Sequence, residues 1–255
     1  MTLGAFEFPP VSHLFEWPEI FLKDTPFAVN KTVLLMWLTV LIAGGIFIVA
    51  GRNFQKIPGK FQSLVESIVN FIDNGIVDEV MGPGNRVWSP YLATLFLFIF
   101  LLNIFEIIPP ISFPGTSRMA VPLFLALLTW VIFIVVGFAK QGPRYITNSI
   151  FPPGVPKPLY VLITPIEFVS VFIVTPFSLA VRLFANLFAG HLLLTAFFLL
   201  TASLWAANVS AVALPLPLFM AIFLTGFEIL VSFLQAYIFT TLTAVYISNS
   251  LHPHH

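Results

Sequence analysis

Five ionisable side chains lie inside or close to long apolar stretches of this chain, and they are the residues that could do chemistry. They are the carboxylates Glu106, Glu167 and Glu228, the imidazole of His191 and the guanidinium of Arg182. Carboxylates and imidazoles take up and release protons, so such groups at different depths could form a proton path. Arginine stays protonated at accessible pH, so Arg182 is a fixed positive charge that could hold an anion or block a proton.

The segment around Arg182 reads PFSLAVRLFANLFAGH from Pro176 to His191, and it predicts a helix with one small, polar face. The residues of that face are three or four apart: Ser178, Arg182, Ala185, Asn186 and Ala189. A charge inside a bilayer costs about 2.5–3.5 kcal/mol, so this arginine indicates a functional site. Two structural alternatives stay open, namely snorkelling of Arg182 to an interface and an ion pair with Glu228 on a facing helix.

Two further polar residues are placed by helical geometry. Gln235 follows Glu228 by seven residues, so the two share a helix face. His191 follows Arg182 by nine residues, about 180° around an ideal helix, so it should point away from the arginine. His191 could be a proton relay or a packed, hydrogen-bonded residue, and both interpretations stay open.

The composition is that of a membrane protein. Of the 255 residues, 58% are hydrophobic and 9% are charged, and the mean hydropathy is +0.99, whereas soluble domains carry about 25% charged residues. The formal net charge is zero, which gives no reason to expect nucleic acid as a partner. The chain has no cysteine, and no His or Asp pair has the spacing of metal ligands, so no metal or other cofactor is expected.

Five apolar stretches are long enough to enter a bilayer core of about 30 Å. The first three are predicted over Thr32–Ala50, Tyr91–Ile108 and Val121–Phe138. Asn103 and Glu106 lie near the far end of the second stretch, where Glu106 could equally be an interfacial carboxylate. Residues 140–158, which include five prolines, are predicted to form a loop.

The last two apolar stretches are too long for simple spans. Ile166–Thr201 has 36 residues and Leu218–Asn249 has 32, which correspond to helices of about 54 and 48 Å. Each must tilt steeply, kink or extend past the membrane. Pro176 is the expected kink site. We therefore predict that these two helices form a long, steeply tilted hairpin.

Residues 61–80 predict a different element, an amphipathic helix on the membrane surface. Its apolar residues recur at helical spacing: Phe61, Leu64, Val65, Ile68, Ile72 and Ile76. Residues 1–30 mix acidic and aromatic side chains and predict an interfacial segment, whereas 31–255 predict a single membrane domain. The predicted fold is thus an all-α polytopic membrane protein with about five inserted helices and one surface helix.

Lysine and arginine are distributed unevenly between the two sides of this arrangement. The connections after the first and third stretches hold seven: Arg52, Lys56, Lys60, Arg86, Lys140, Arg144 and Lys157. The N-terminal segment and the turn after the second stretch hold three: Lys23, Lys31 and Arg118. Because positive residues favour the cytoplasmic side, we predict an outside N-terminus and an inside C-terminus. This pattern and the chain length favour a bacterial plasma (inner) membrane.

Three stretches, taken in order, resemble subunit a of F-type ATP synthases. FLLNIFEIIPP at 100–110 resembles that family's asparagine–acid–proline turn, and RLFANLFAGH at 182–191 resembles its arginine motif. FEILVSFLQAYIFTTLTAVYI at 227–247 resembles its last helix. The resemblance covers nearly everything after the first 30 residues. One departure is Ala185, where many members have glycine, and it keeps the face small.

The resemblance implies a stator subunit of a rotary motor, with c-ring rotor subunits, peripheral-stalk b subunits and other ATP synthase subunits as partners. It implies two proton half-channels to and from the c-ring, kept apart by the essential Arg182, and no catalytic residue in this chain. Nine residues would shape proton translocation: Arg182, Glu228, His191, Gln235, Asn186, Glu167, Glu106, Asn103 and Ser178. Five of them would line the half-channel by which protons enter from outside: Glu228, His191, Glu167, Glu106 and Asn103.

Two other classes of function stay open on the residues alone. A free-standing secondary transporter could bind an anionic substrate with Arg182, but such proteins usually contain an internal repeat, and none is visible between the halves of this sequence. A purely structural membrane scaffold would tolerate replacement of Arg182 by alanine.

Overall fold

The computed structural model describes residues 29–52, 55, 57–105, 107–108, 119–151, 157–206 and 215–251. The regular elements that these residues form are helices. Five helical stretches among them are long and apolar enough to cross a membrane. The protein is therefore an all-α, polytopic membrane protein, as the sequence predicts. The predicted interfacial segment lies almost entirely outside the described residues, so the division at residue 30 stays a prediction.

The first three predicted spans are helices α2 (Lys31–Arg52), α4 (Ser89–Ile104) and α5 (Ala120–Gln141). A 3₁₀ turn, η2 (Pro83–Trp88), leads into α4. Helix α4 ends four residues earlier than predicted, so Asn103 lies in its last turn. The sequence accounts for this early end, because prolines at 109 and 110 have no amide hydrogen for a helix and disfavour helical backbone in the residue before them.

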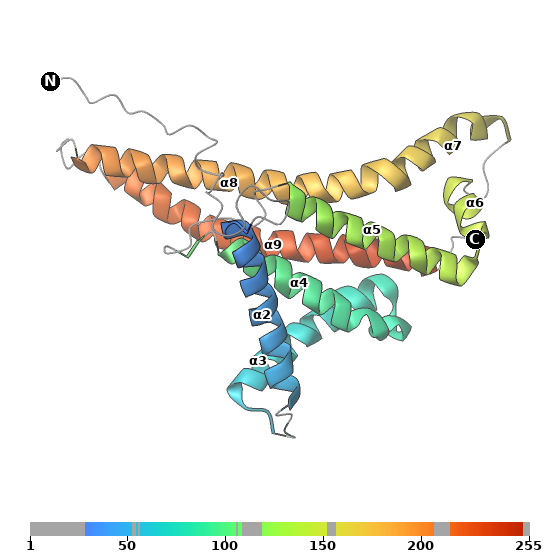
Figure 1. The fold of residues 1–255 in the computed structure, drawn as a ribbon, viewed down its shortest axis with the longest axis horizontal. Coiled ribbons are helices and arrows are strands. Elements are labelled where there is room, and N and C mark those ends of the chain that lie inside the picture. The colour runs from blue at the N-terminus through green and yellow to red at the C-terminus, as the bar shows by residue number, and fades with distance from the viewer. Residues whose placement is uncertain are drawn as a thin grey trace.

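The two long stretches form a helical hairpin, as predicted. The first consists of α7 (Tyr160–Val169), a π-helical turn η4 (Ser170–Val174) and α8 (Thr175–Ala206). The second is α9 (Pro215–Leu251). The candidate spans Tyr160–Trp205 and Pro215–Leu251 have 46 and 37 residues, which correspond to about 69 and 56 Å. Figure 1 shows α8 and α9 running in opposite directions along the long axis of the molecule, with α2 crossing them steeply. Their tilt against a bilayer stays a prediction.

The irregular turn in the first long stretch lies just before Pro176 rather than at it. Residues Ser170–Val174 are π-helical, and the Thr175 hydroxyl donates a hydrogen bond to the Ser170 carbonyl at 2.9 Å. The pyrrolidine ring crowds the carbonyl four residues earlier and offers it no amide hydrogen, so the preceding turn widens. Helix α7 accordingly bends away from the line of α8 (Figure 1).

The predicted amphipathic helix is α3 (Lys60–Ile72), and it continues as a π-helical segment, η1 (Asp73–Met81). Ile72 and Ile76 are fully buried in the core, whereas Leu64 is exposed. The segment η1 packs against α9, and the Ser248 hydroxyl donates to the Val80 carbonyl at 3.3 Å. The apolar face of the second half of this element therefore packs against the protein core, while Asn74 and Glu79 are exposed. The surface position of α3 stays a prediction.

The prediction of a loop over residues 140–158 is wrong for its middle part, where α6 (Arg144–Ile150) forms a short helix. Tyr145 of α6 is buried and lies with its ring on Gly137 of α5. Its hydroxyl lies 3.3 Å from the Ser250 hydroxyl, and the Gln141 amide donates to the Ser250 carbonyl at 2.9 Å. These contacts satisfy backbone and side-chain groups at the end of α9 and fix that end against α5.

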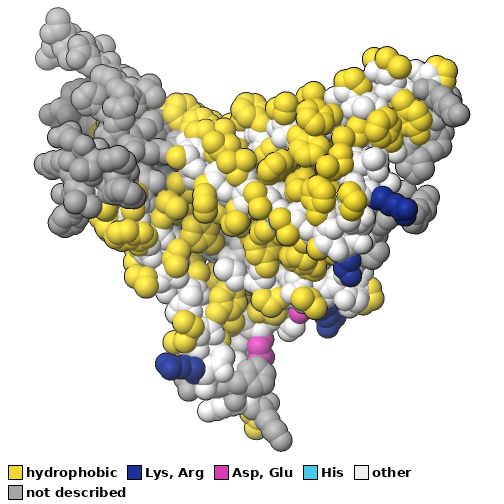
Figure 2. All heavy atoms as spheres, turned by 45° about the vertical axis from the view of Figure 1, so that its right-hand side comes forward, with side chains coloured by type: hydrophobic (Ala, Val, Ile, Leu, Met, Phe, Trp, Pro, Cys, Tyr) yellow, Lys and Arg dark blue, Asp and Glu magenta, His cyan; other side chains and the backbone are white. Residues whose placement is uncertain are grey.

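The outer surface is mostly apolar, as expected for a protein surrounded by lipid. On the face shown in Figure 2, hydrophobic side chains cover most of the surface, and the visible charged side chains lie along its lower and right-hand borders. Exposed Trp37 and Leu41 of α2 continue this apolar surface. A surface of this kind would be unfavourable in water, and it supports the assignment as a membrane protein.

Candidate functional site

The small, polar face predicted around Arg182 is a face of α8 that the described part of the chain leaves uncovered. Its five residues are all exposed: Ser178, Arg182, Ala185, Asn186 and Ala189. The opposite side of α8 carries Leu179, Leu183 and Leu187, which are buried in the core. The leucines hold α8 against the other helices, so the arginine face is turned outward as a consequence of packing.

Arg182 makes no ion pair or hydrogen bond with the residues that the structure describes, whereas Arg86 forms one with Asp78. The alternative in which Arg182 pairs with Glu228 is therefore not found. The reason lies in the register between α8 and α9, which two contacts define.

The Asn186 amide donates a hydrogen bond to Gln235 Oε1 at 2.9 Å, and Gly190 faces the Glu228 carboxylate. Residue numbers rise along α8 as they fall along α9, so Arg182, one turn before Asn186, lies near the level of Ile238. Glu228 lies at the level of Gly190, about 12 Å farther along α8 from Arg182. The structure thus places the arginine and the acid of the facing helix at different levels along the hairpin.

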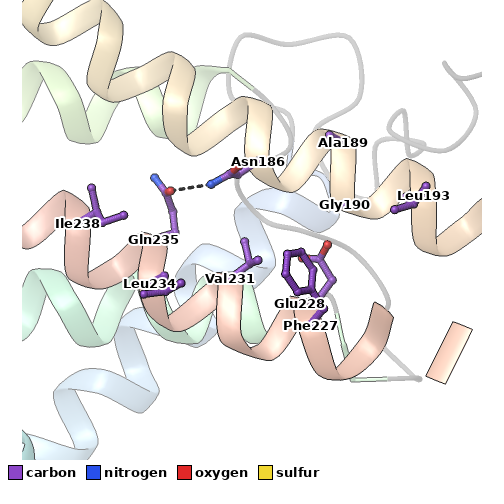
Figure 3. A pocket seen from close by; sticks show the side chains of 10 residues that line it. All are labelled: Asn186, Ala189, Gly190, Leu193, Phe227, Glu228, Val231, Leu234, Gln235 and Ile238. Atoms are coloured by element: carbon purple, nitrogen blue, oxygen red, sulfur yellow. Dashed lines mark hydrogen bonds between the residues drawn. The ribbon is translucent and has the colours of Figure 1, made fainter. Parts of the chain in front are cut away.

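A groove of about 340 Å³ separates α8 and α9 beside these contacts. Figure 3 shows the Asn186 and Gln235 side chains pointing toward each other across it, with Glu228 farther along α9. Glu228 and Gln235 are only 4% and 1% exposed, while Asn186 is exposed. The groove therefore connects two buried polar groups to the uncovered face. Its lining residues are Asn186, Ala189, Gly190, Leu193, Phe227, Glu228, Val231, Leu234, Gln235 and Ile238.

Gly190 is a site residue that the sequence analysis missed. A Cβ atom at position 190 would lie 2.6 Å from Glu228 Cδ and 2.8 Å from Glu228 Oε2, so only glycine leaves room for the carboxylate. Glycine inside a helix costs about 0.5–1 kcal/mol relative to alanine. That cost, at a position beside His191 in an otherwise apolar helix, is the signal in the sequence that could have identified a close contact.

Asn103 is brought to the same depth as Glu228. The Phe233 ring of α9 packs against the rings of Phe96 and Phe100 of α4, at centroid distances of 5.7 and 6.3 Å. Helices α4 and α9 run in opposite directions (Figure 1), so Asn103, one turn after Phe100, lies near the level of Glu228. The Asn103 side chain is fully buried.

The three remaining predicted site residues are His191, Glu106 and Glu167. His191 is half-buried and directly follows Gly190, the residue that contacts Glu228. Glu106 lies outside the described residues. Glu167 is half-buried on α7, on the other side of Arg182 from His191, and it does not line the groove. The structure therefore does not bring Glu167 together with His191 and Glu228, with which the sequence analysis grouped it.

Residues 33–248 match a protein family described as ATP synthase A chain. The chain belongs to this family. The protein named ATP synthase subunit a from Parafrankia sp. (strain EAN1pec) is 40% identical over 256 residues, which is 96% of this chain and 84% of the relative. The protein of the same name from Rhodococcus erythropolis (strain PR4 / NBRC 100887) is 38% identical, and the alignment covers 98% of this chain and 93% of the relative. The one from Methylobacterium sp. (strain 4-46) is 40% identical over 89% of both.

The match to the ATP synthase A chain family includes all of α4, α5, α8 and the groove-lining part of α9. Arg182, the Asn186–Gln235 hydrogen bond and the Glu228 contact with Gly190 therefore all lie within the segment that the family defines. The resemblance inferred from three short motifs is confirmed over most of the chain.

Proposed function

We propose that this chain is the proton-conducting stator subunit of a rotary F-type ATP synthase in a bacterial plasma membrane. The observation that carries the proposal is the position of Arg182, exposed on a small-residue face and without an ion-pair partner among the described residues. A guanidinium at membrane depth requires a counter-charge, and in this family a partner can supply it. The c-ring rotor subunits are the partner that we propose for this face.

Arg182 would act as a fixed charge between two proton half-channels. The small residues beside it, Ala185 and Ala189, let a helix of the rotor approach closely. The guanidinium attracts a deprotonated carboxylate on that helix and forms strong, charge-assisted hydrogen bonds with it. Since arginine does not release its proton, it blocks direct passage between the channels.

The outer half-channel would run past Asn103, Glu228 and His191. Glu228 lines the groove, and His191 directly follows the groove-lining Gly190. Glu106 would lie at its entrance. With the predicted orientation, a proton enters from outside and neutralises the rotor carboxylate. Only the neutral acid can then turn into lipid, because a bare carboxylate there is prohibitively costly.

The inner half-channel would lie on the other side of Arg182, with Ser178 and Glu167 as its residues. The proton leaves here after nearly a full turn of the rotor. A transmembrane potential supplies about 2.3 kcal/mol per charge for each 100 mV. Peripheral-stalk b subunits would hold this chain in place, and other subunits of the complex would carry out the catalysis of ATP synthesis.

The test is ATP-driven proton pumping in membrane vesicles that carry the assembled complex, with Arg182→Ala compared with wild type. Arg52→Ala is the matched control, because Arg52 is an exposed arginine at the end of α2 and does not line the groove. We expect Arg182→Ala to abolish pumping with normal assembly, and Arg52→Ala to pump normally. Normal pumping by Arg182→Ala would contradict the proposal. Anion transport by the purified chain alone would instead favour a secondary transporter.

A further inference from the structure

Ser232 is a buried polar residue that the proposed function does not yet use. It is four residues after Glu228 and three before Gln235, so the three share one face of α9. Ser232 is 0% exposed and does not line the open groove. Its hydroxyl oxygen and the Gln235 amide nitrogen are both buried, and neither has a hydrogen-bond partner among the described residues.

Two such groups side by side require a partner. A buried polar atom without a hydrogen bond costs about 1–3 kcal/mol, and native proteins rarely leave two neighbouring ones unsatisfied. Buried water usually binds where two to four polar groups converge. The Ser232 hydroxyl, the Gln235 amide and the Glu228 carboxylate supply three such groups on one helix face, at the depth where α4 contributes Asn103.

We propose that Ser232 and Gln235 hold an ordered water molecule that carries protons from the Glu228 carboxyl group into the groove beside the Asn186–Gln235 pair. This inference rests on the proposed function. In one transfer, the O–H bond of protonated Glu228 breaks and its proton passes to the water oxygen. A different O–H bond of that water then breaks, and its proton passes to the next water molecule in the groove on the way to the rotor carboxylate. The ordered water is thereby restored, and Glu228 remains as a carboxylate. Ser232 is a positioning residue, because its hydroxyl fixes the water and is not itself consumed.

Removal of the hydroxyl separates this role from a structural one. Ser232→Ala breaks no hydrogen bond within the described protein, so the complex should assemble normally. Loss of one hydrogen bond to the water should lower ATP-driven pumping by about twofold to tenfold. Thr243→Val is the matched control, because Thr243 is a fully buried hydroxyl on the same helix that already donates to the Phe239 carbonyl at 2.9 Å. The control should pump normally.

A second measurement asks whether water reaches position 232. The chain has no cysteine, so Ser232→Cys introduces the only thiol of this subunit. We expect a small water-soluble thiol reagent to modify Ser232→Cys in the assembled complex and to leave Thr243→Cys unmodified. Normal pumping by Ser232→Ala would overturn the inference, and so would reduced pumping combined with an unreactive Ser232→Cys.

Arg182→Ala, measured in the same vesicles, tells the two proposals apart. If Arg182→Ala abolishes pumping while Ser232→Ala pumps normally, only the water site is contradicted. If Arg182→Ala pumps normally, the proposed function fails, and the water site fails with it.

Discussion

Replacement of Gly190 by alanine should displace the Glu228 carboxylate without preventing assembly. The new Cβ would lie 2.6 Å from Glu228 Cδ, whereas ordinary contact begins at 3.4 Å, so the carboxyl group must move by about an ångström. Overpacking of this kind costs about 1–3 kcal/mol, and the better helix propensity of alanine returns about 0.5–1 kcal/mol. The net cost is therefore small. A misplacement of about 1 Å can nevertheless lower a reaction rate by up to 100-fold.

The assay is ATP-driven pumping, normalised to the amount of assembled complex in the same membranes. We expect Gly190→Ala to reduce pumping at least about tenfold, with near-normal assembly. Gly226→Ala is the control on the facing helix, since a Cβ there meets nothing within 4 Å. The shorter acid of Gly190→Ala/Glu228→Asp should restore part of the lost rate. If Gly190→Ala pumps within about twofold of wild type, the position of the carboxylate against Gly190 is not important and this reasoning is refuted.

Two further predictions concern stability. Gly137→Ala would place a Cβ 2.6 Å from Tyr145 Cζ, and a packed ring cannot move aside as a flexible carboxylate can. We therefore expect this variant to be destabilised by about 1–3 kcal/mol and to have a lower Tm in detergent, whereas Gly45→Ala, where a Cβ meets nothing within 4 Å, should have an unchanged Tm. An unchanged Tm for Gly137→Ala would contradict this packing. Arg86 donates to Asp78 at 3.2 Å and holds the pKa of that carboxyl below its ordinary value of 3.8. A lowered folded-state pKa stabilises the protein above the unfolded value and loses its effect as the pH falls through the folded one. Arg86→Gln should therefore lower the Tm slightly at pH 7 and not at strongly acidic pH, and a pH-independent difference would exclude this ion pair as its cause.

The parts of the fold that the sequence predicts correctly are those encoded in local composition and period. Hydropathy and length define α2, α5, α8 and α9, because lipid demands a long apolar helix whatever its neighbours are. The face around Arg182 follows from the helical period alone. Its exposure follows as well, because the leucines on the other side of α8 have to be buried.

The features that the sequence analysis missed depend on contacts between helices. The contact of Glu228 with Gly190 depends on the register of α8 against α9, which neither helix encodes by itself. The same register puts Arg182 and Glu228 at different levels along the hairpin, so the ion pair that the sequence left open does not form. The short helix α6 lies in a proline-rich stretch whose local pattern predicts a loop, whereas the packing of Tyr145 against Gly137 is a contact between α6 and α5 that the local pattern does not show.

The grouping of Glu167 with His191 and Glu228 shows a different limit. A list of polar residues in apolar segments does not say on which side of Arg182 each one lies. Along the continuous helix from α7 to α8, Glu167 precedes Arg182 and His191 follows it. If Arg182 separates two half-channels, Glu167 and His191 therefore belong to different ones.

The central claim is that Arg182 keeps the two half-channels apart, and passive proton leak tests it most directly. The leak would be recorded without ATP, under an applied potential, in vesicles that carry the assembled complex with wild-type subunit or Arg182→Ala. A raised leak in Arg182→Ala, together with lost ATP-driven pumping, is the result that the account predicts. A leak equal to that of wild type, together with normal pumping, would contradict it and return Arg182 to a structural role.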